Sequence, residues 1–165
     1  MLGHSRLDCL RRYGRGGVMR RCAILLTALL PAIAQADYGS VRVDEVAAVY
    51  DGDTFTATIS EWPPVIGERI KIRISGINAP ERRSRCDTEA EKERERELAA
   101  NARIYLVERL RSTDVVELRR IERGSFFRII AEVWADGENV GHEMLEAGHA
   151  LPYVTGQSGQ AWCGL

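Results

Sequence analysis

The stretch RIKIRISGINAPE, residues 69–81, places an alternating β pattern directly before a group of polar residues. Isoleucines at positions 70, 72 and 74 alternate with Lys71 and Arg73, which predicts a strand over residues 69–77 with one buried face. Pro80 cannot donate to a strand ladder and ends the pattern. We therefore expect the polar residues of SGINAPE to lie at the end of a strand.

A second stretch, YDGDT at residues 50–54, also lies at the end of a β-rich run. Together the two stretches bring Asp53, Asn78, Glu81 and Arg73 to strand ends. Carboxylate and amide oxygens are ligands for a hard cation such as Ca²⁺, and an arginine can hold a phosphate through two parallel hydrogen bonds. This set predicts metal-assisted phosphodiester cleavage. Taken singly, the aspartates fit a hairpin turn and Arg73 fits a solvated strand position.

The element order predicts an α+β, mainly β fold: a five-stranded barrel of the OB type, with a helix between strands 3 and 4 and a short C-terminal helix. Such barrels commonly bind oligonucleotides on one face. A buried stripe at helical spacing supports the longer helix, whereas the charged run 89–97 at its start is typical of a solvated face. The expected strands are residues 41–49, 54–59, 69–77, 115–121 and 128–135, and the expected helices are residues 88–111 and 139–147.

Residues 1–36 have the features of a secretory signal. Two arginines after Met19 precede an apolar run, and Ala34-Gln-Ala36 follows as a cleavage site. The run is too short to span a bilayer. We expect one domain over residues 37–165, exported to the periplasm or the medium, monomeric and free of the membrane once the signal is removed. Met19 remains a candidate true start, and an N-terminal core helix is the alternative to a signal.

Removal of residues 1–36 makes the remaining chain acidic. That segment holds six arginines and one aspartate of the chain's 23 basic and 24 acidic residues, so 17 and 23 remain, a net charge of −6. This argues against a protein that coats nucleic acid through bulk positive charge. Arg82, Arg83 and Arg85 form a local basic cluster that would either guide a nucleic-acid backbone or serve as a soluble loop.

Cys86 and Cys163 are the two cysteines that remain after residue 36. A pair of cysteines in an exported domain predicts a disulfide, and two free thiols are the alternative. Neither a CxxC motif nor a Cys/His spacing suggests zinc.

The chain resembles the staphylococcal nuclease (thermonuclease) family over roughly residues 41–153. The resemblance rests on the order and spacing of several short motifs, none decisive alone: YDGDT at 50–54, IRISGINAPE at 72–81, the Ala-x-x-Ala-Arg-x-x-Leu pattern at 99–106, Phe127-Arg128, and ADG at 135–137 leading to Leu-x-x-Gly-x-Ala at 145–150. It implies an OB-type barrel that hydrolyses phosphodiesters of DNA and RNA with Ca²⁺.

The resemblance also implies the metal ligands. Asp53 matches the aspartate ligand, Asn78 stands where the family usually has a second aspartate, and Ala79 stands where a backbone carbonyl ligates. Asp51 matches an acid that lies just behind these ligands. Because Asn78 removes one negative charge, we expect weaker Ca²⁺ binding than in the family pattern.

The remaining matches concern catalysis. Glu81 matches the residue that holds, and deprotonates, the attacking water, while Arg73 and Arg128 match the arginines that bind the phosphate. A cation and two guanidinium groups would neutralise the charge that grows in the transition state. Phe126 replaces a tyrosine that the family often has beside the phosphate. The alternative function is a non-catalytic OB-fold module that binds single-stranded nucleic acid.

Overall fold

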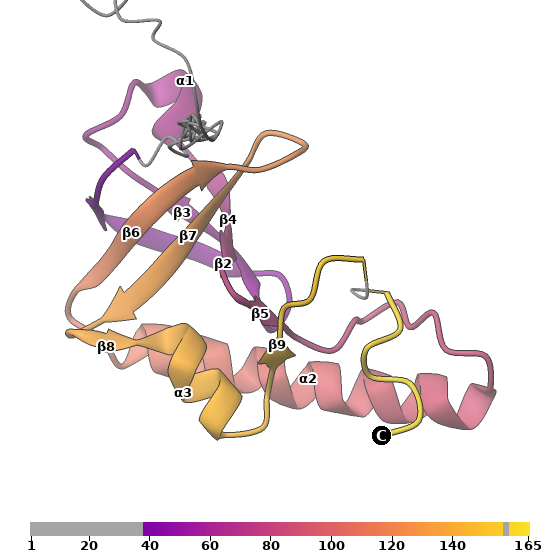
Figure 1. Cartoon of the computed structure of the whole chain (residues 1–165). Helices are drawn as coiled ribbons and strands as arrows, with labels where there is room; N and C mark the ends of the chain where they lie inside the picture. Colours follow the sequence, from indigo (N-terminus) through magenta and orange to yellow (C-terminus); the bar gives the residue numbers. More distant parts are fainter. Residues whose placement is uncertain (1–37, 157–158) are drawn as a thin grey trace, which may run out of the picture. The chain divides into compact units, whose positions relative to one another are not determined.

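The computed structural model describes residues 38–156 and 159–165, and these form a mainly β, OB-like α+β fold with three helices (Figure 1). Residues 1–36, expected to be the signal, lie outside the described part. No helix among the described residues has both the length and the apolar character needed to cross a membrane.

One curled sheet carries most of the strands. Its path runs β1-β6-β7-β4-β3-β2, and β8 extends it from β7. All its pairings are antiparallel except that of β4 with β7, which is parallel. The strands are β1 (Val41–Val43), β2 (Glu45–Val49), β3 (Thr54–Thr58), β4 (Ile70–Ile74), β6 (Val116–Arg123), β7 (Arg128–Ala135) and β8 (Glu138–Asn139).

The sheet curls because its two ends belong to one stretch of chain. β1 pairs with β6 and β2 pairs with β3, yet only Asp44 separates β1 from β2. The result is a half-barrel. The prediction of a single strand over 41–49 therefore covers two strands, divided where the chain turns from one edge of the sheet to the other.

The predicted third strand is also divided. It ends at Ile74, turns at Gly76, which has a φ of +75°, and resumes as β5 (Ile77–Asn78), paired with β9 (Leu151–Pro152) in a second small sheet. The strand count thus differs from the five predicted. The alternation itself is confirmed, because Ile70, Ile72 and Ile74 are buried.

Three helices accompany the sheet. Figure 1 shows the long helix α2 (Glu89–Arg111) along one end of the sheet, with α3 (Val140–Glu146) beside it. Thr88 caps α2 by accepting the Glu91 N–H, and Glu91 reciprocates at Thr88, a capping box. The connection between β3 and β4 contains a short helix, α1 (Pro64–Gly67), which was not predicted.

The core fills the space between the curled sheet and α2. Phe55, Ile72, Leu118, Val133 and Leu106 are all fully buried. The buried apolar face of α2, which includes Leu106, packs against the strands. This packing fixes the helix beside the ends of β2 and β5. The YDGDT turn and the NAPE segment consequently meet at one place.

Candidate functional site

The YDGDT turn and the strand β4 are joined by a buried ion pair. Arg73 Nη1 pairs with Asp53 Oδ1, although the residues are 20 positions apart in the chain. β3 and β4 place them, because Thr54 lies opposite Arg73 in the antiparallel register. Asp53 is only 3% exposed, so its charge requires the partners that the fold supplies.

Both oxygens of Asp53 are occupied. Oδ1 also accepts from the Thr54 hydroxyl at 2.9 Å, and Oδ2 accepts from the Ala79 N–H at 3.1 Å. The Asp53 N–H donates in turn to Asp51 Oδ1 at 3.2 Å. The structure therefore brings Asp51, Asp53 and Ala79 together through these hydrogen bonds. Ligation of an ion by the Ala79 carbonyl stays a prediction.

Gly52 permits this close meeting. A Cβ at position 52 would lie 2.7 Å from the Cβ of Ala79 and 2.8 Å from that of Ala102 on α2. Only glycine lets the turn approach both so closely. The glycine of the DGD motif is therefore required for packing, in addition to the carboxylates that flank it.

Asn78 contributes a second oxygen to the guanidinium of Arg73. Arg73 Nη2 lies 3.5 Å from Asn78 Oδ1 and 3.4 Å from the Ile77 carbonyl oxygen. Asn78 is held on its other side by Trp162, whose Nε1 donates to the Asn78 carbonyl at 3.2 Å. Oxygens of Asp53, Asn78 and Ile77 therefore converge on one cationic group.

Two of the predicted site residues have buried nitrogens without a hydrogen-bond partner. Across the described residues, these atoms are Asn78 Nδ2 and Arg128 Nε. Native proteins leave few such groups, since each costs about 1–3 kcal/mol. Arg128 lies on β7, paired with Lys71, two positions along the strand from the pair that contains Arg73. The two arginines thus belong to neighbouring strands.

Burial, together with neighbouring negative charge, raises the pKa of two carboxyl groups. The pKa of Asp51 rises to about 6, mainly because the group is buried and then because Asp53 is charged. Burial, followed by the charge of Asp53, also raises the pKa of Glu81, while Arg73 opposes that shift. A carboxyl whose pKa lies closer to neutrality is a better proton acceptor at working pH.

Glu95 is a site residue that the sequence did not reveal. The Glu81 N–H donates to Glu95 Oε1 at 3.0 Å, and Glu95 is only 2% exposed. It belongs to the charged run 89–97 that was expected to be solvated, so that expectation is wrong at this residue. The glutamates of this run look alike in the sequence. The loop that carries Glu81 determines which of them is buried, and local sequence does not show where that loop will lie.

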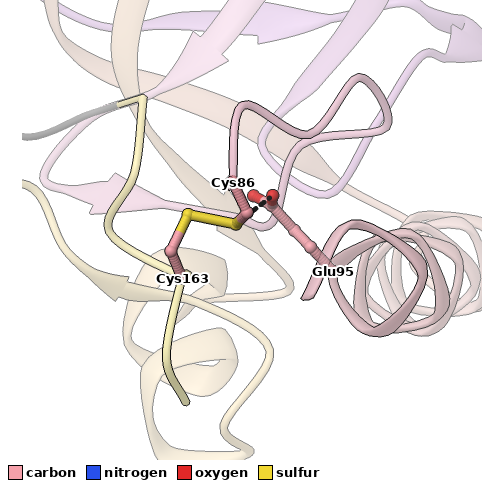
Figure 2. Close-up of side chains that lie close together, drawn as sticks. All are labelled: Cys86, Glu95 and Cys163. Carbon is pink, nitrogen blue, oxygen red and sulfur yellow. Dashed lines mark hydrogen bonds between the residues drawn. A yellow bond between two sulfur atoms is a disulfide. The ribbon is translucent and has the colours of Figure 1, made fainter. Parts of the chain in front are cut away.

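A disulfide joins Cys86 to Cys163, as predicted. Figure 2 shows the bridge beside Glu95, whose Oε2 lies 3.4 Å from Cys86 Sγ. Cys86, Glu95 and Cys163 form the set of three potential ligand groups within 4.8 Å that occurs among the described residues. Because the two sulfurs are bonded to each other, this set offers no thiolate for a metal.

The three arginines after Glu81 are exposed. Arg82 reaches back to the YDGDT turn, with its guanidinium 5.4 Å from the Tyr50 ring. Arg83 and Arg85 line a cavity of about 430 Å³ together with Glu81 and Gly159. The fold therefore places all three beside the candidate site.

The donor set fits a hard cation. Carboxylate and amide oxygens already converge on the Arg73 guanidinium, and the mutual repulsion among Asp51, Asp53 and Glu81 would be relieved by positive charge. Asp53 and Asn78 would hold such an ion. The arrangement can gather a cation, a phosphate-binding arginine and a proton acceptor.

Comparison with known protein families gives one match. The family described as "Staphylococcal nuclease homologue" matches residues 71–161, which is 91 of the 165 residues. The match includes Arg73, Asn78, Glu81 and Arg128, while Asp53 lies before it. A search of curated proteins finds no match.

Proposed function

We propose that this protein is a nuclease, because the chain belongs to the staphylococcal nuclease homologue family, whose members are generally phosphodiesterases. The family and the OB-like fold establish a nuclease-like or nucleic-acid-binding module. The finer proposal is that the protein hydrolyses phosphodiester bonds of DNA or RNA and depends on Ca²⁺. The observation that carries it is the buried Asp53–Arg73 pair, with Asn78 Oδ1 at the same guanidinium.

Glu81 is proposed as the proton acceptor. Its raised pKa suits a group that must take a proton from water near neutral pH. Its backbone is fixed by the N–H bond to the buried Glu95. A carboxylate held in this way can orient a water for in-line attack on phosphorus.

Arg73 and Arg128 are proposed to bind the phosphate. Each guanidinium can make two parallel hydrogen bonds to phosphate oxygens. Arg128 Nε lacks a partner in the structure, and the Arg73 guanidinium lies beside the side-chain oxygens of Asp53 and Asn78. Both arginines are thus suited to neutralise the charge that develops on the phosphate.

Asp53 and Asn78 are the proposed ligands of the ion, with Asp51 behind them. When bound, Ca²⁺ would supply a Lewis acid that polarises the phosphate. We further propose that residues 1–36 direct export and are removed after Ala36, which mass spectrometry of the exported protein would detect as Asp37 at the N-terminus.

Incubation of the purified protein with plasmid and with single-stranded DNA, in Ca²⁺ or in EDTA, tests the proposal. We expect cleavage in Ca²⁺ and none in EDTA. Binding of single strands without cleavage in either condition would replace the nuclease by the non-catalytic binding module.

A further inference from the structure

We propose that a basic groove between α2 and the part of the sheet formed by β2, β3 and β4 is the track along which a single nucleic-acid strand approaches the site. The inference rests on the proposed function in naming the site that the strand reaches. The groove has a volume of about 700 Å³ and includes residues of β2, β3, β4 and α2. That volume is within the range of pockets that bury a small ligand, so it suits a short stretch of one strand.

Positive charge distinguishes this groove. Lys71, Arg82, Arg96 and Arg103 line it, and no acidic residue of the described chain does. Arg96 also pairs with Glu93 at 2.6 Å, outside the groove. A phosphate backbone is attracted to such a concentration of cations, which contrasts with the acidic net charge of residues 37–165.

A neighbouring groove provides an internal comparison. It has a similar volume, about 720 Å³, and contains Arg103 and Arg111, but three acidic residues, Asp44, Glu45 and Asp114, also line it. Those carboxylates would repel a phosphate backbone. Charge complementarity therefore selects the first groove and not the larger one.

Tyr50 provides a surface for a base. Its side chain is 53% exposed, with Lys71 Nζ 5.9 Å and the Arg82 guanidinium carbon 5.4 Å from the ring centroid. Stacking of bases on aromatic rings beside cations is the usual way to bind single strands without sequence preference. The ring requires an unpaired base, so the occupant is a single strand and not a duplex.

The groove leads directly to the site. Tyr50 precedes Asp51, and Arg82 follows Glu81. Lys71 and Arg73 are two positions apart on β4, so their side chains emerge on the same face. A strand that contacts Lys71 would therefore present its next phosphates toward Arg73.

Small and fixed side chains form the other wall. Ala99 and Ala100 of α2 line the groove, which leaves room above the helix. Arg103 is held in place because its Nε donates to the Val49 carbonyl at 3.0 Å. Its remaining guanidinium nitrogens stay available for phosphate.

The test measures binding and not cleavage. Fluorescence anisotropy of a short labelled oligothymidylate, in EDTA and over a series of salt concentrations, would compare the wild type with the double variant Lys71→Gln, Arg103→Gln. Two lost phosphate contacts should reduce the salt slope by about 1.4 and weaken binding roughly 25-fold at about 0.1 M salt. The matched control is Arg42→Gln, Arg94→Gln, two exposed arginines outside the groove, which should bind like the wild type.

A second variant guards against a folding defect. Ala100→Asp adds repulsion to the groove from an exposed helix position, and should weaken binding while the melting temperature stays near that of the wild type. Three results would each overturn the inference. The control and groove variants could lose affinity equally, both groove variants could bind like the wild type, or the wild type could show no measurable binding. Because the assay contains no Ca²⁺, it can detect binding in the groove even if the protein does not cleave. Cleavage could likewise occur in a protein that does not bind a strand in this groove.

Discussion

At the scale of single residues, Glu95 links the helix α2 to the loop that carries Glu81. Replacement by alanine would leave the Glu81 N–H without its acceptor, at a cost of about 1–3 kcal/mol. We expect Glu95→Ala to lower both the melting temperature and the cleavage rate, and Glu95→Gln, which keeps an acceptor oxygen, to retain most of both. Melting curves and cleavage rates measure this, with the exposed Glu97→Ala as control. Unchanged cleavage in Glu95→Ala would show that Glu95 does not position Glu81.

Asn78 sets the expected affinity for Ca²⁺. With an amide in place of a carboxylate, we predict a Kd of about 10⁻⁴–10⁻³ M, the range of extracellular calcium modules. Asn78→Asp should tighten binding by restoring a charged ligand. Calorimetric titration of both proteins measures it, and equal or weaker affinity in the aspartate variant would remove Asn78 from the proposed ligands.

The residues of the candidate site differed in how well the sequence predicted them. Asp53 and Arg73 were predictable because strand alternation and the turn motif place both at strand ends, and the structure pairs them. Glu95 was not, because its burial depends on a loop folding over one position of a uniformly charged run. The contribution of Tyr50 to the groove was missed for a similar reason, since it requires β4 and the Arg82 loop to converge on one ring.

At the scale of secondary structure, Asp44 controls the bend between β1 and β2. Its carboxylate accepts the Ser60 N–H at 2.6 Å, and this bond holds the pKa of Asp44 below its ordinary value of 3.8. A lowered pKa in the folded protein means that the ionised group stabilises the fold above that ordinary value. The stabilisation is lost as the pH falls through the lowered pKa.

We therefore predict that Asp44→Asn lowers the melting temperature at neutral pH, and that the difference from the wild type shrinks as the pH falls below 3.8. Thermal melting across that range measures it, with the exposed Glu61→Gln as a control for net charge. A difference that stays constant with pH would assign the effect to something other than ionisation of Asp44.

The elements themselves were largely predictable, and their breaks were not. Alternation identified residues 70–74, and the apolar spacing identified α2 almost to the residue. The division at Asp44 and the turn at Gly76 arise because one segment must pair with two different strands. Such long-range pairing is not encoded in local periodicity.

At the scale of the whole molecule, the disulfide ties the C-terminal tail to the loop after Glu81. It spans 77 residues, and the chain-entropy contribution of a loop that long is roughly 4 kcal/mol. That is a large share of the ~5–15 kcal/mol that stabilises a typical domain. The tail also supplies the Trp162 bond to the Asn78 carbonyl, so the bridge supports the site as well as the fold.

Reduction should therefore lower the melting temperature and weaken Ca²⁺ binding together. A reductant should have no further effect on the double variant Cys86→Ser, Cys163→Ser, which serves as control. Mass spectrometry of a non-reduced digest should recover the two cysteine peptides linked. Recovery of both as free thiols would rule out the bridge in the protein.

Above all, we propose that Glu81 acts on water at a site built by Asp53 and Arg73. The most direct test is the cleavage rate of a single-stranded oligonucleotide in saturating Ca²⁺, for the wild type and for Glu81→Gln, with circular dichroism to verify that both are folded. We expect Ca²⁺-dependent cleavage by the wild type and a rate lower by roughly 10²–10⁴-fold in the variant. Cleavage by folded Glu81→Gln at the wild-type rate would contradict this proposal.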